Sequence, residues 1–235
     1  MLRLATRPSR HTFTEATASP MPSTDAHRPL TPTTERGLKR RDALMDAAQK
    51  LFLERGYGQV SVNDIVAEAG GSLSTLYRHF GNKEGLFQAM IERRSHYLYE
   101  ALSAEGVDGL SIEEALQRLG VTLLIKVTDC ETLGIYREVV AESPRQPELG
   151  QLFYAAGPGR VRQALATYLE RQMRAGRLPQ GDAVELAGIF LGSVLGELHL
   201  TQLLQLESPP SQAAIEQRVA CCVSLFVGGL RYAEA

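Results

Sequence analysis

Hydrophobic residues recur along most of the chain at the spacing of one face of a helix. Leu44, Ala48, Leu51 and Phe52 stand at i, i+4, i+7 and i+8, which predicts a first helix that Gly56 ends. Comparable patterns continue to about residue 232, with neither the alternation typical of β-strands nor an internal repeat. The sequence therefore predicts an all-α fold.

Small polar residues and glycines mark the expected ends of the next helices. Ser61, with Asp64 three residues later, begins a short second helix, and Ser72 begins a third. The pairs Gly70-Gly71 and Gly81-Asn82 end these two helices. Further helices are predicted at about residues 82–104, 111–128, 131–141, 148–175, 182–206 and 211–232, with a kink favoured at residues 157–159.

These elements divide the chain into four segments. Residues 1–34 contain five prolines among many Thr and Ser residues and show no periodicity, so we expect a disordered leader. Its Arg-rich, acid-poor composition also resembles an organelle transit peptide, which is the alternative interpretation. Residues 35–81 are expected to form a helix-turn-helix domain, residues 82–104 a connecting helix, and residues 105–235 a larger helical domain.

The composition is that of an ordinary globular protein, with one asymmetry. Of the 235 residues 44% are hydrophobic and 22% charged, and the formal net charge is −2. Residues 1–41 nevertheless hold eight basic and three acidic side chains, which fits an end that meets phosphates or a solvated basic tail. The three cysteines lack metal-ligand spacing, and no apolar run is long enough to span a membrane. We therefore expect a cytoplasmic protein without a membrane segment or metal site.

The stretch from Ser61 to Lys83 carries the candidate chemistry, because two short helices joined by a glycine turn form a helix-turn-helix. At about 100° per residue the second helix has two sides. Leu73, Leu76, Tyr77 and Phe80 are expected to pack, and Ser74, Thr75, Arg78 and His79 to face outward. Hydroxyls can bond base edges or phosphates, and an arginine can bond guanine or a phosphate. Periodicity alone also allows a three-helix module that only packs.

The same region resembles the N-terminal domain of the TetR/AcrR family of repressors over about fifty residues. The similarity rests on Arg41-Asp42-Ala43-Leu44, Leu51-Phe52, Gly56-Tyr57, Ser61-Val62, Ile65, Ala69-Gly70, Ser72, Thr75, Tyr77, His79-Phe80 and Lys83-Glu84-Gly85-Leu86-Phe87. Residues 136–191, with Ala141-Glu142-Ser143-Pro144 and Pro147-Glu148-Leu149, look like the AefR-like type of C-terminal domain.

The resemblance implies a homodimeric, DNA-binding transcriptional regulator with one recognition helix per subunit in successive major grooves of a palindromic operator. It implies phosphate contacts by Ser61, Tyr77, His79 and Lys83, and base or groove contacts by Ser72, Leu73, Ser74 and Thr75. Arg78 joins this set because of its own chemistry. Repression is the usual mode of the family, with release by a small-molecule effector.

Two positions depart from the family pattern. Gly71 stands where an apolar Val or Ile is usual, so the turn lacks an anchor, and Leu73 stands where a polar residue is common. The helical wheel groups Leu73 with the core, although from the first turn it can also reach a thymine methyl. The missing anchor keeps an alternative open, namely a helical ligand-binding or protein-docking module without DNA binding.

Two helices of the larger domain are candidates for a dimer interface. Gly188, Gly192 and Gly196 repeat every four residues on one helix face, which favours the close approach of another backbone. The last helix offers apolar side chains for the same contact, namely Val219, Val223, Phe226, Val227 and Leu230. We predict a four-helix bundle from these two helices of each subunit, the alternative being close packing within one chain.

Four residues of this domain are candidates to line an effector pocket: Tyr136, Phe153, Tyr154 and His199. They offer aromatic surface with a few polar points, which suits an apolar or aromatic small molecule, although each is also compatible with plain core packing. The five histidines are scattered, and the chain has neither a Gly-x-Ser-x-Gly motif nor a phosphate loop. We therefore expect no catalytic residues, no cofactor and no enzymatic activity.

Overall fold

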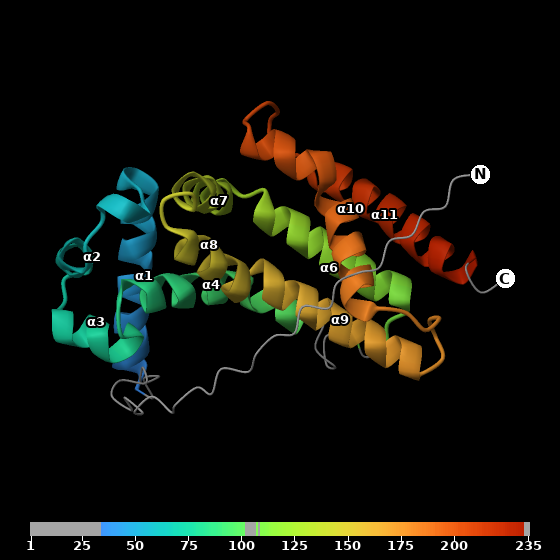
Figure 1. The fold of residues 1–235 in the computed structure, drawn as a ribbon, viewed down its shortest axis with the longest axis horizontal. Helices are drawn as coiled ribbons and strands as arrows, with labels where there is room; N and C mark the ends of the chain where they lie inside the picture. The colour runs from blue at the N-terminus through green and yellow to red at the C-terminus, as the bar shows by residue number, and fades with distance from the viewer. Residues whose placement is uncertain (1–33, 102–106, 108, 233–235) are drawn as a thin grey trace, which may run out of the picture.

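The computed structural model describes residues 34–101, 107 and 109–232 (Figure 1). The leader predicted at residues 1–34 lies outside this part of the chain, except for Thr34. Every regular element of the described residues is a helix, so the predicted all-α fold is confirmed. The elements are α1 (Glu35–Arg55), the 3-10 helix η1 (Tyr57–Gln59), α2 (Val62–Ala69), α3 (Leu73–Phe80), α4 (Lys83–Glu100), α6 (Ile112–Val127), α7 (Cys130–Glu142), α8 (Pro147–Ala156), α9 (Pro158–Arg174), α10 (Ala183–Leu203) and α11 (Gln212–Tyr232).

Side-chain caps explain where several of these helices begin. Ser61 and Ser111 each accept a hydrogen bond from the backbone N–H three residues later. Asp64 and Glu114 accept one in return from the backbone N–H of the cap, so α2 and α6 start with complete capping boxes. Ser72 caps α3 by accepting from a backbone N–H of its first turn. These bonds satisfy donors that a first helical turn leaves unpaired, which fixes each starting point.

The long helix expected at residues 148–175 is two helices. α8 ends at Ala156, and α9 begins at Pro158 after Gly157, whose φ of −121° and ψ of −94° are not helical. Proline has no N–H to donate to the preceding turn, so the hydrogen-bond ladder stops there. The kink favoured by the sequence is therefore a break between two helices.

α10 also breaks, at a position that the sequence pattern does not reveal. Gly196 has φ 40° and ψ −142°, a conformation that a residue with a Cβ rarely adopts. Arg218 of α11 donates to the carbonyls of Ser193 (3.0 Å) and Val194 (2.8 Å), so the carbonyls beside the break have partners. The break sets the direction of the last turns of α10, which carry His199.

The helices bury two clusters of hydrophobic side chains. We call the first the proximal core: it joins α1 to α4 with α7 and α8. The second, the distal core, is formed mainly by α6, α9, α10 and α11. In Figure 1, α2 and α3 lie at one end of the molecule, and α10 and α11 lie away from them. Because Ile135 and Leu149 belong to the proximal core, that core extends beyond the domain boundary expected at residue 105.

Candidate functional site

α2 and α3 form the predicted helix-turn-helix, and α1 and α4 pack against α3 (Figure 1). Leu76 and Phe80 are buried and hold α3 to the proximal core. The exposed residues of α3 are Leu73, Ser74, Tyr77 and Arg78, beside the partly buried Thr75. This helix therefore presents hydroxyls, a phenol, an aliphatic side chain and a guanidinium, which are groups that contact phosphates and base edges.

The observed exposure corrects the helical wheel at three residues. The wheel groups Leu73 and Tyr77 with the packed side, but their side chains are 37% and 41% exposed. It turns His79 outward, but His79 is only 6% exposed, and both ring nitrogens lack a hydrogen-bond partner among the described residues. A wheel carries no information about which helices surround α3. Because α1, α2 and α4 all contact it, the buried face reaches His79 and leaves Leu73 and Tyr77 outside.

Ser61 and Lys83, two predicted phosphate contacts, are held in place by local bonds. The Ser61 hydroxyl belongs to the capping box of α2 and is exposed. Lys83 Nζ donates to the carbonyl of Tyr57 at 2.5 Å and lies 3.9 Å from the centre of the Tyr57 ring. Burial lowers the pKa of Lys83. Lys83 therefore joins α4 to η1 in this structure, and its contact with a DNA phosphate stays a prediction.

Arg40 of α1 occupies the space beside Gly71 in the turn. Its Nη1 donates to the carbonyl of Ala69 at 3.1 Å, and its Nη2 donates to the carbonyl of Gly70. A Cβ at Gly71 would lie 3.3 Å from Arg40 Nη2. A cation thus holds the C-terminal end of α2, where unpaired carbonyls favour positive charge. Sequence analysis missed this residue, although the absent side chain at Gly71 signals that another group fills the space.

A cavity of about 400 Å³ lies between the proximal and distal cores. Its walls come from α4, α6, α7, α8, α9 and α10, and aliphatic side chains of both cores line it, among them Ile91, Leu98, Leu123, Ile135 and Val161. Tyr136, Phe153, Tyr154 and His199, the four predicted pocket residues, all line this cavity. Its size and apolar lining are those of a small-molecule site.

Tyr136 stands at the centre of an aromatic cluster on the cavity wall. Its ring centre is 5.1 Å from that of Phe153 and 5.0 Å from that of His199, with interplanar angles of 84° and 80°. These edge-to-face contacts are favourable arrangements of aromatic rings. His199 is 8% exposed, and its Nε2 has no hydrogen-bond partner among the described residues. Burial lowers the pKa of His199, so its ring is neutral near pH 7.

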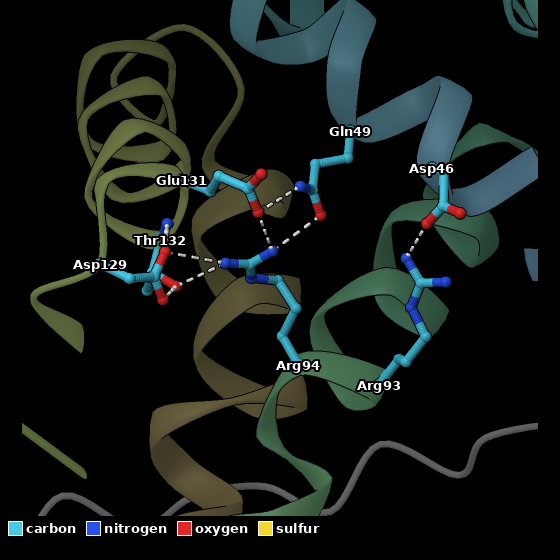
Figure 2. A network of polar contacts seen from close by, with 7 residues as sticks. All are labelled: Asp46, Gln49, Arg93, Arg94, Asp129, Glu131 and Thr132. Atoms are coloured by element: carbon cyan, nitrogen blue, oxygen red, sulfur yellow. Dashed lines mark hydrogen bonds and ion pairs between the residues drawn. The ribbon is translucent and has the colours of Figure 1, made fainter. Parts of the chain in front are cut away.

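Arg94 of α4 lines the cavity and bonds to two other helices (Figure 2). Its guanidinium donates to Gln49 of α1 at 2.9 Å and to Thr132 of α7 at 2.8 Å. It also pairs with Asp129, the cap of α7, at 3.1 Å and with Glu131 at 3.0 Å. One side chain of the cavity wall is therefore bonded to the first helix of the DNA-binding module.

The preceding residue makes a simpler contact. Arg93 pairs with Asp46 of α1 at 2.6 Å (Figure 2). It also lies 3.7 Å from Asp42 of the same helix. It is absent from the described lining of the cavity. Arg93 thus joins α4 to α1 alone, whereas Arg94 joins both helices to α7 and to the cavity.

The predicted interface residues of α11 lie on the face of that helix that packs in the distal core. Val219, Val223 and Val227 are buried in the distal core, so they pack within their own subunit and are not available to a partner. Phe226 and Leu230 are partly buried against the same core. Sequence analysis chose the apolar stripe of α11, and a buried stripe and an interface stripe look alike in sequence.

The three glycines of α10 also have different surroundings. A Cβ at Gly188 would lie 3.1 Å from Arg162 of the same chain, whereas a Cβ at Gly192 would meet nothing within 4 Å. Gly196 is required by the break in the helix. Apolar residues that the sequence analysis missed are exposed nearby on α10 and α11: Ile189, Leu200 and Leu225. The high apolar content of both helices is the signal for them.

Two family models match the chain. The model of bacterial regulatory proteins of the tetR family matches residues 44–90. The model of the AefR-like transcriptional repressor C-terminal domain matches residues 114–233, which is about half of the chain. Together they cover the helix-turn-helix and the cavity-lining residues of α6 to α10, but not those of α4.

Similar proteins agree with these matches. The HTH-type transcriptional regulator YvkB of Bacillus subtilis (strain 168) is 27% identical over 194 residues, 80% of this chain and 95% of YvkB. The structure of the Flavonoid-responsive Regulator FrrA is 32% identical, with a TM-score of 0.67 over 81% of this chain and 96% of FrrA. A TetR-family regulator of Mesorhizobium loti MAFF303099 shares the fold, with a TM-score of 0.71 at 24% identity over 83% of this chain and 98% of its own. This chain therefore belongs to the TetR family of DNA-binding transcriptional regulators, which are not enzymes, and carries an AefR-like C-terminal domain.

Proposed function

We propose that this regulator is a cytoplasmic, homodimeric repressor that binds a palindromic operator and leaves it when a small apolar or aromatic molecule fills the cavity. In this account α3 of each subunit enters a major groove. The contacts to bases and phosphates come from Ser72, Leu73, Ser74, Thr75, Tyr77 and Arg78, with Ser61 and Lys83 at the phosphates of the groove edge. His79 is left out of this set because it is buried.

The alternative, a helical module without DNA binding, rests on the missing apolar anchor at Gly71. Arg40 argues against it, because its guanidinium fills the space at Gly71 and bonds the last carbonyls of α2. The turn is thus held by a guanidinium group in place of an apolar side chain. DNA binding is therefore the better account of the exposed groups on α3.

The effector site follows from the cavity. Its wall is mostly apolar, it has room for a drug-sized molecule, and aromatic rings face it from α7 and α8. One relative, FrrA, is named as responsive to flavonoids, which are aromatic molecules. We extend that chemistry to this chain as the expectation that an aromatic molecule fills the cavity.

The position of Arg94 is the observation that supports a link between the cavity and the DNA-binding helices. It lines the cavity, and it donates to Gln49 of α1, the helix that packs against α2 and α3. A ligand that displaces Arg94 or Thr132 changes the bonds between α7 and α1. We infer that the ligand shifts α1 and α4 relative to α7, which changes the spacing of the two recognition helices away from about 34 Å.

The test compares Arg94→Lys with Arg93→Lys. Both variants keep the positive charge, but lysine cannot make the several directed bonds of the Arg94 guanidinium. Operator affinity is measured by fluorescence anisotropy, and affinity for a hydroxyflavone by calorimetry. At a saturating ligand concentration, the wild-type protein and Arg93→Lys are expected to release the duplex, and Arg94→Lys is expected to retain it. Full release by Arg94→Lys with ligand bound contradicts the proposed link.

A dimer interface at α10 and α11 is supported by their exposed apolar surface. By length and composition both helices suffice to cross a membrane, yet only 28% and 22% of their most apolar windows are buried inside the subunit. In a DNA-binding regulator, apolar surface of this kind is expected to meet a second copy of the chain. Leu225, which is 72% exposed, and Ile189 belong to this surface.

Cysteine cross-linking tests the interface. Cys221 is exposed on α11, and Cys130 is exposed at the start of α7, away from the proposed contact. A chain that retains only Cys221 is expected to form a covalent dimer with a short bis-maleimide, and a chain that retains only Cys130 is not. Equal cross-linking of the two, or a monomer in sedimentation equilibrium, would remove α11 from the interface.

A further inference from the structure

The polar groups on the cavity wall indicate what kind of molecule the cavity takes. Three cationic side chains line it, Arg94, Lys126 and Arg162, and the lining residues that the structure describes include no Asp or Glu. A cationic ligand would therefore find no counter-charge on this wall. Its desolvation would not be compensated, so an organic cation is a poor fit.

The cationic groups are already engaged. Arg94 is paired with Asp129 and Glu131, and Arg162 Nε donates to the carbonyl of Val184 at 3.0 Å. Lys126 is not free either. A carboxylate ligand would have to compete with these existing bonds. The wall therefore does not favour a negatively charged ligand over an uncharged one.

His199 is the group that lacks a partner. Its imidazole is more than nine-tenths buried, it lines the cavity, and its Nε2 has no hydrogen bond within the described part of the chain. Burial lowers the pKa of His199, so the ring is neutral and has one donor and one acceptor nitrogen. A ligand hydroxyl can donate to one tautomer or accept from the other, whereas a carbonyl can only accept.

The cavity wall beside His199 suits an aromatic ring of a ligand. Tyr136 stands nearly perpendicular to both His199 and Phe153, so ring edges and faces are presented to the same space. A flat aromatic molecule can continue this edge-to-face arrangement, and a flexible aliphatic chain cannot. The remaining lining is largely aliphatic, which favours an uncharged molecule.

We propose that the ligand of this cavity is an uncharged, planar aromatic molecule with a phenolic hydroxyl, and that this hydroxyl donates a hydrogen bond to the imidazole of His199. The proposal rests on the proposed function of the cavity as the effector site. It adds the ligand class and the residue that selects it.

The test uses three pairs of phenols and their methyl ethers: 2-naphthol, 4-hydroxybiphenyl and 4′-hydroxyflavone, each against its methoxy counterpart. A methyl ether keeps the ring and the acceptor oxygen but loses the donor. Calorimetry on the full-length protein is expected to show about tenfold preference for the phenol in at least one pair, the factor expected of one hydrogen bond.

His199→Phe is expected to bring the two members of that pair to within about twofold, by the same conversion of affinity. His199→Asn, which keeps a donor and an acceptor, is expected to retain part of the preference and serves if the Phe variant fails to fold. His96→Phe is the matched control, because it makes the same substitution at an exposed histidine outside the described cavity lining and should leave the preference unchanged.

Three results overturn the proposal: equal affinities within every pair for the wild-type protein, a preference that survives His199→Phe, or failure of all six compounds to bind. Decanoate is added as a further probe, and its binding in preference to the phenols would assign the cavity to carboxylates. A phenol that binds through His199 without releasing the operator contradicts the proposed function but not the ligand class, so the two failures are distinguishable.

Discussion

The centre of the proximal core and the wall of the cavity are packed differently in this regulator. In the proximal core the rings of Phe52, Tyr57 and Phe87 contact one another, with ring centres 5.0 to 6.1 Å apart, and fill the space between α1 and α4. The cavity of about 400 Å³ lies between the two cores, and side chains of both line it, so this wall borders empty space. A surface that must fit DNA benefits from a filled core, whereas a site that admits a ligand needs space.

The difference in packing indicates whether the functional groups of each region lie on the surface or inside the protein. The groups of α3 that we propose to face DNA are on the surface, and the core below them holds their geometry. The groups proposed to meet a ligand are inside, so their own packing is incomplete until the ligand arrives. We therefore expect ligand binding to raise the stability of the protein, because it fills apolar space in the folded state alone.

The sharpest contrast is expected between two phenylalanines. Phe52→Ala empties a filled core and should cost about 3–5 kcal/mol of unfolding free energy, with loss of operator binding. Phe153→Ala should cost about 1 kcal/mol, since that ring already borders empty space. Urea denaturation at several protein concentrations measures both and separates folding from dimer dissociation. Equal costs for the two substitutions would remove the distinction between the filled centre of the proximal core and the cavity wall.

The second effect concerns the surface of α3. Tyr77→Ala and Arg78→Ala should each lower operator affinity about 10- to 100-fold with little change in stability, because both side chains are exposed. Tyr154→Ala, an exposed aromatic residue at the cavity, is the control and should leave operator affinity unchanged in the absence of ligand. Unchanged affinity in both α3 variants, measured by anisotropy, would contradict the assignment of α3 as the recognition helix.

The third effect concerns Gly71 and Arg40. Gly71→Val should cost about 1–2 kcal/mol, because the new side chain displaces Arg40 from the carbonyls of Ala69 and Gly70. In an Arg40→Leu background the same substitution should be neutral or stabilising, since the turn then regains an apolar anchor. A double-mutant cycle of thermal unfolding measures this coupling. Additive effects would show that Arg40 does not support the turn.

The smallest effect is a pH dependence. Burial lowers the pKa of His199 in the folded protein, so below pH 6.5 the unfolded chain takes up a proton that the folded protein does not. The unfolding free energy should therefore fall as the pH is lowered from 7 to 5, and this part of the slope should be absent in His199→Phe. Identical slopes in the two proteins would mean that His199 is not buried as described.

The helix-turn-helix was predictable because its signals are contiguous. Ser61, Ser72 and the glycine pairs mark the helix ends within about twenty residues, and the caps form as expected. What the sequence did not reveal was the side of α3 that its neighbours cover. The burial of His79 and the exposure of Tyr77 depend on α1 and α4, which no helical wheel includes.

The cavity, in contrast, has no contiguous signal in the sequence, because residues of six helices contribute to it. Tyr136, Phe153, Tyr154 and His199 were chosen for their chemistry, and the structure brings them together. The position of His199 depends on the break at Gly196 and on Arg218, which bonds the carbonyls beside it. Arg40 and Arg94 were missed for the same reason, since each bonds to groups that lie far away in sequence.

The central claim is that this protein reads DNA as a dimer through two copies of α3. Selection of bound duplexes from a random pool by the purified full-length protein, followed by sequencing, tests it most directly. The account predicts enrichment of a palindrome whose half-sites lie about one helical turn apart, 10–10.5 base pairs from centre to centre, or a multiple of that distance. It also predicts that the Tyr77→Ala/Arg78→Ala variant enriches nothing. No enrichment by folded, ligand-free protein at low salt, or equal enrichment by the variant, would contradict it.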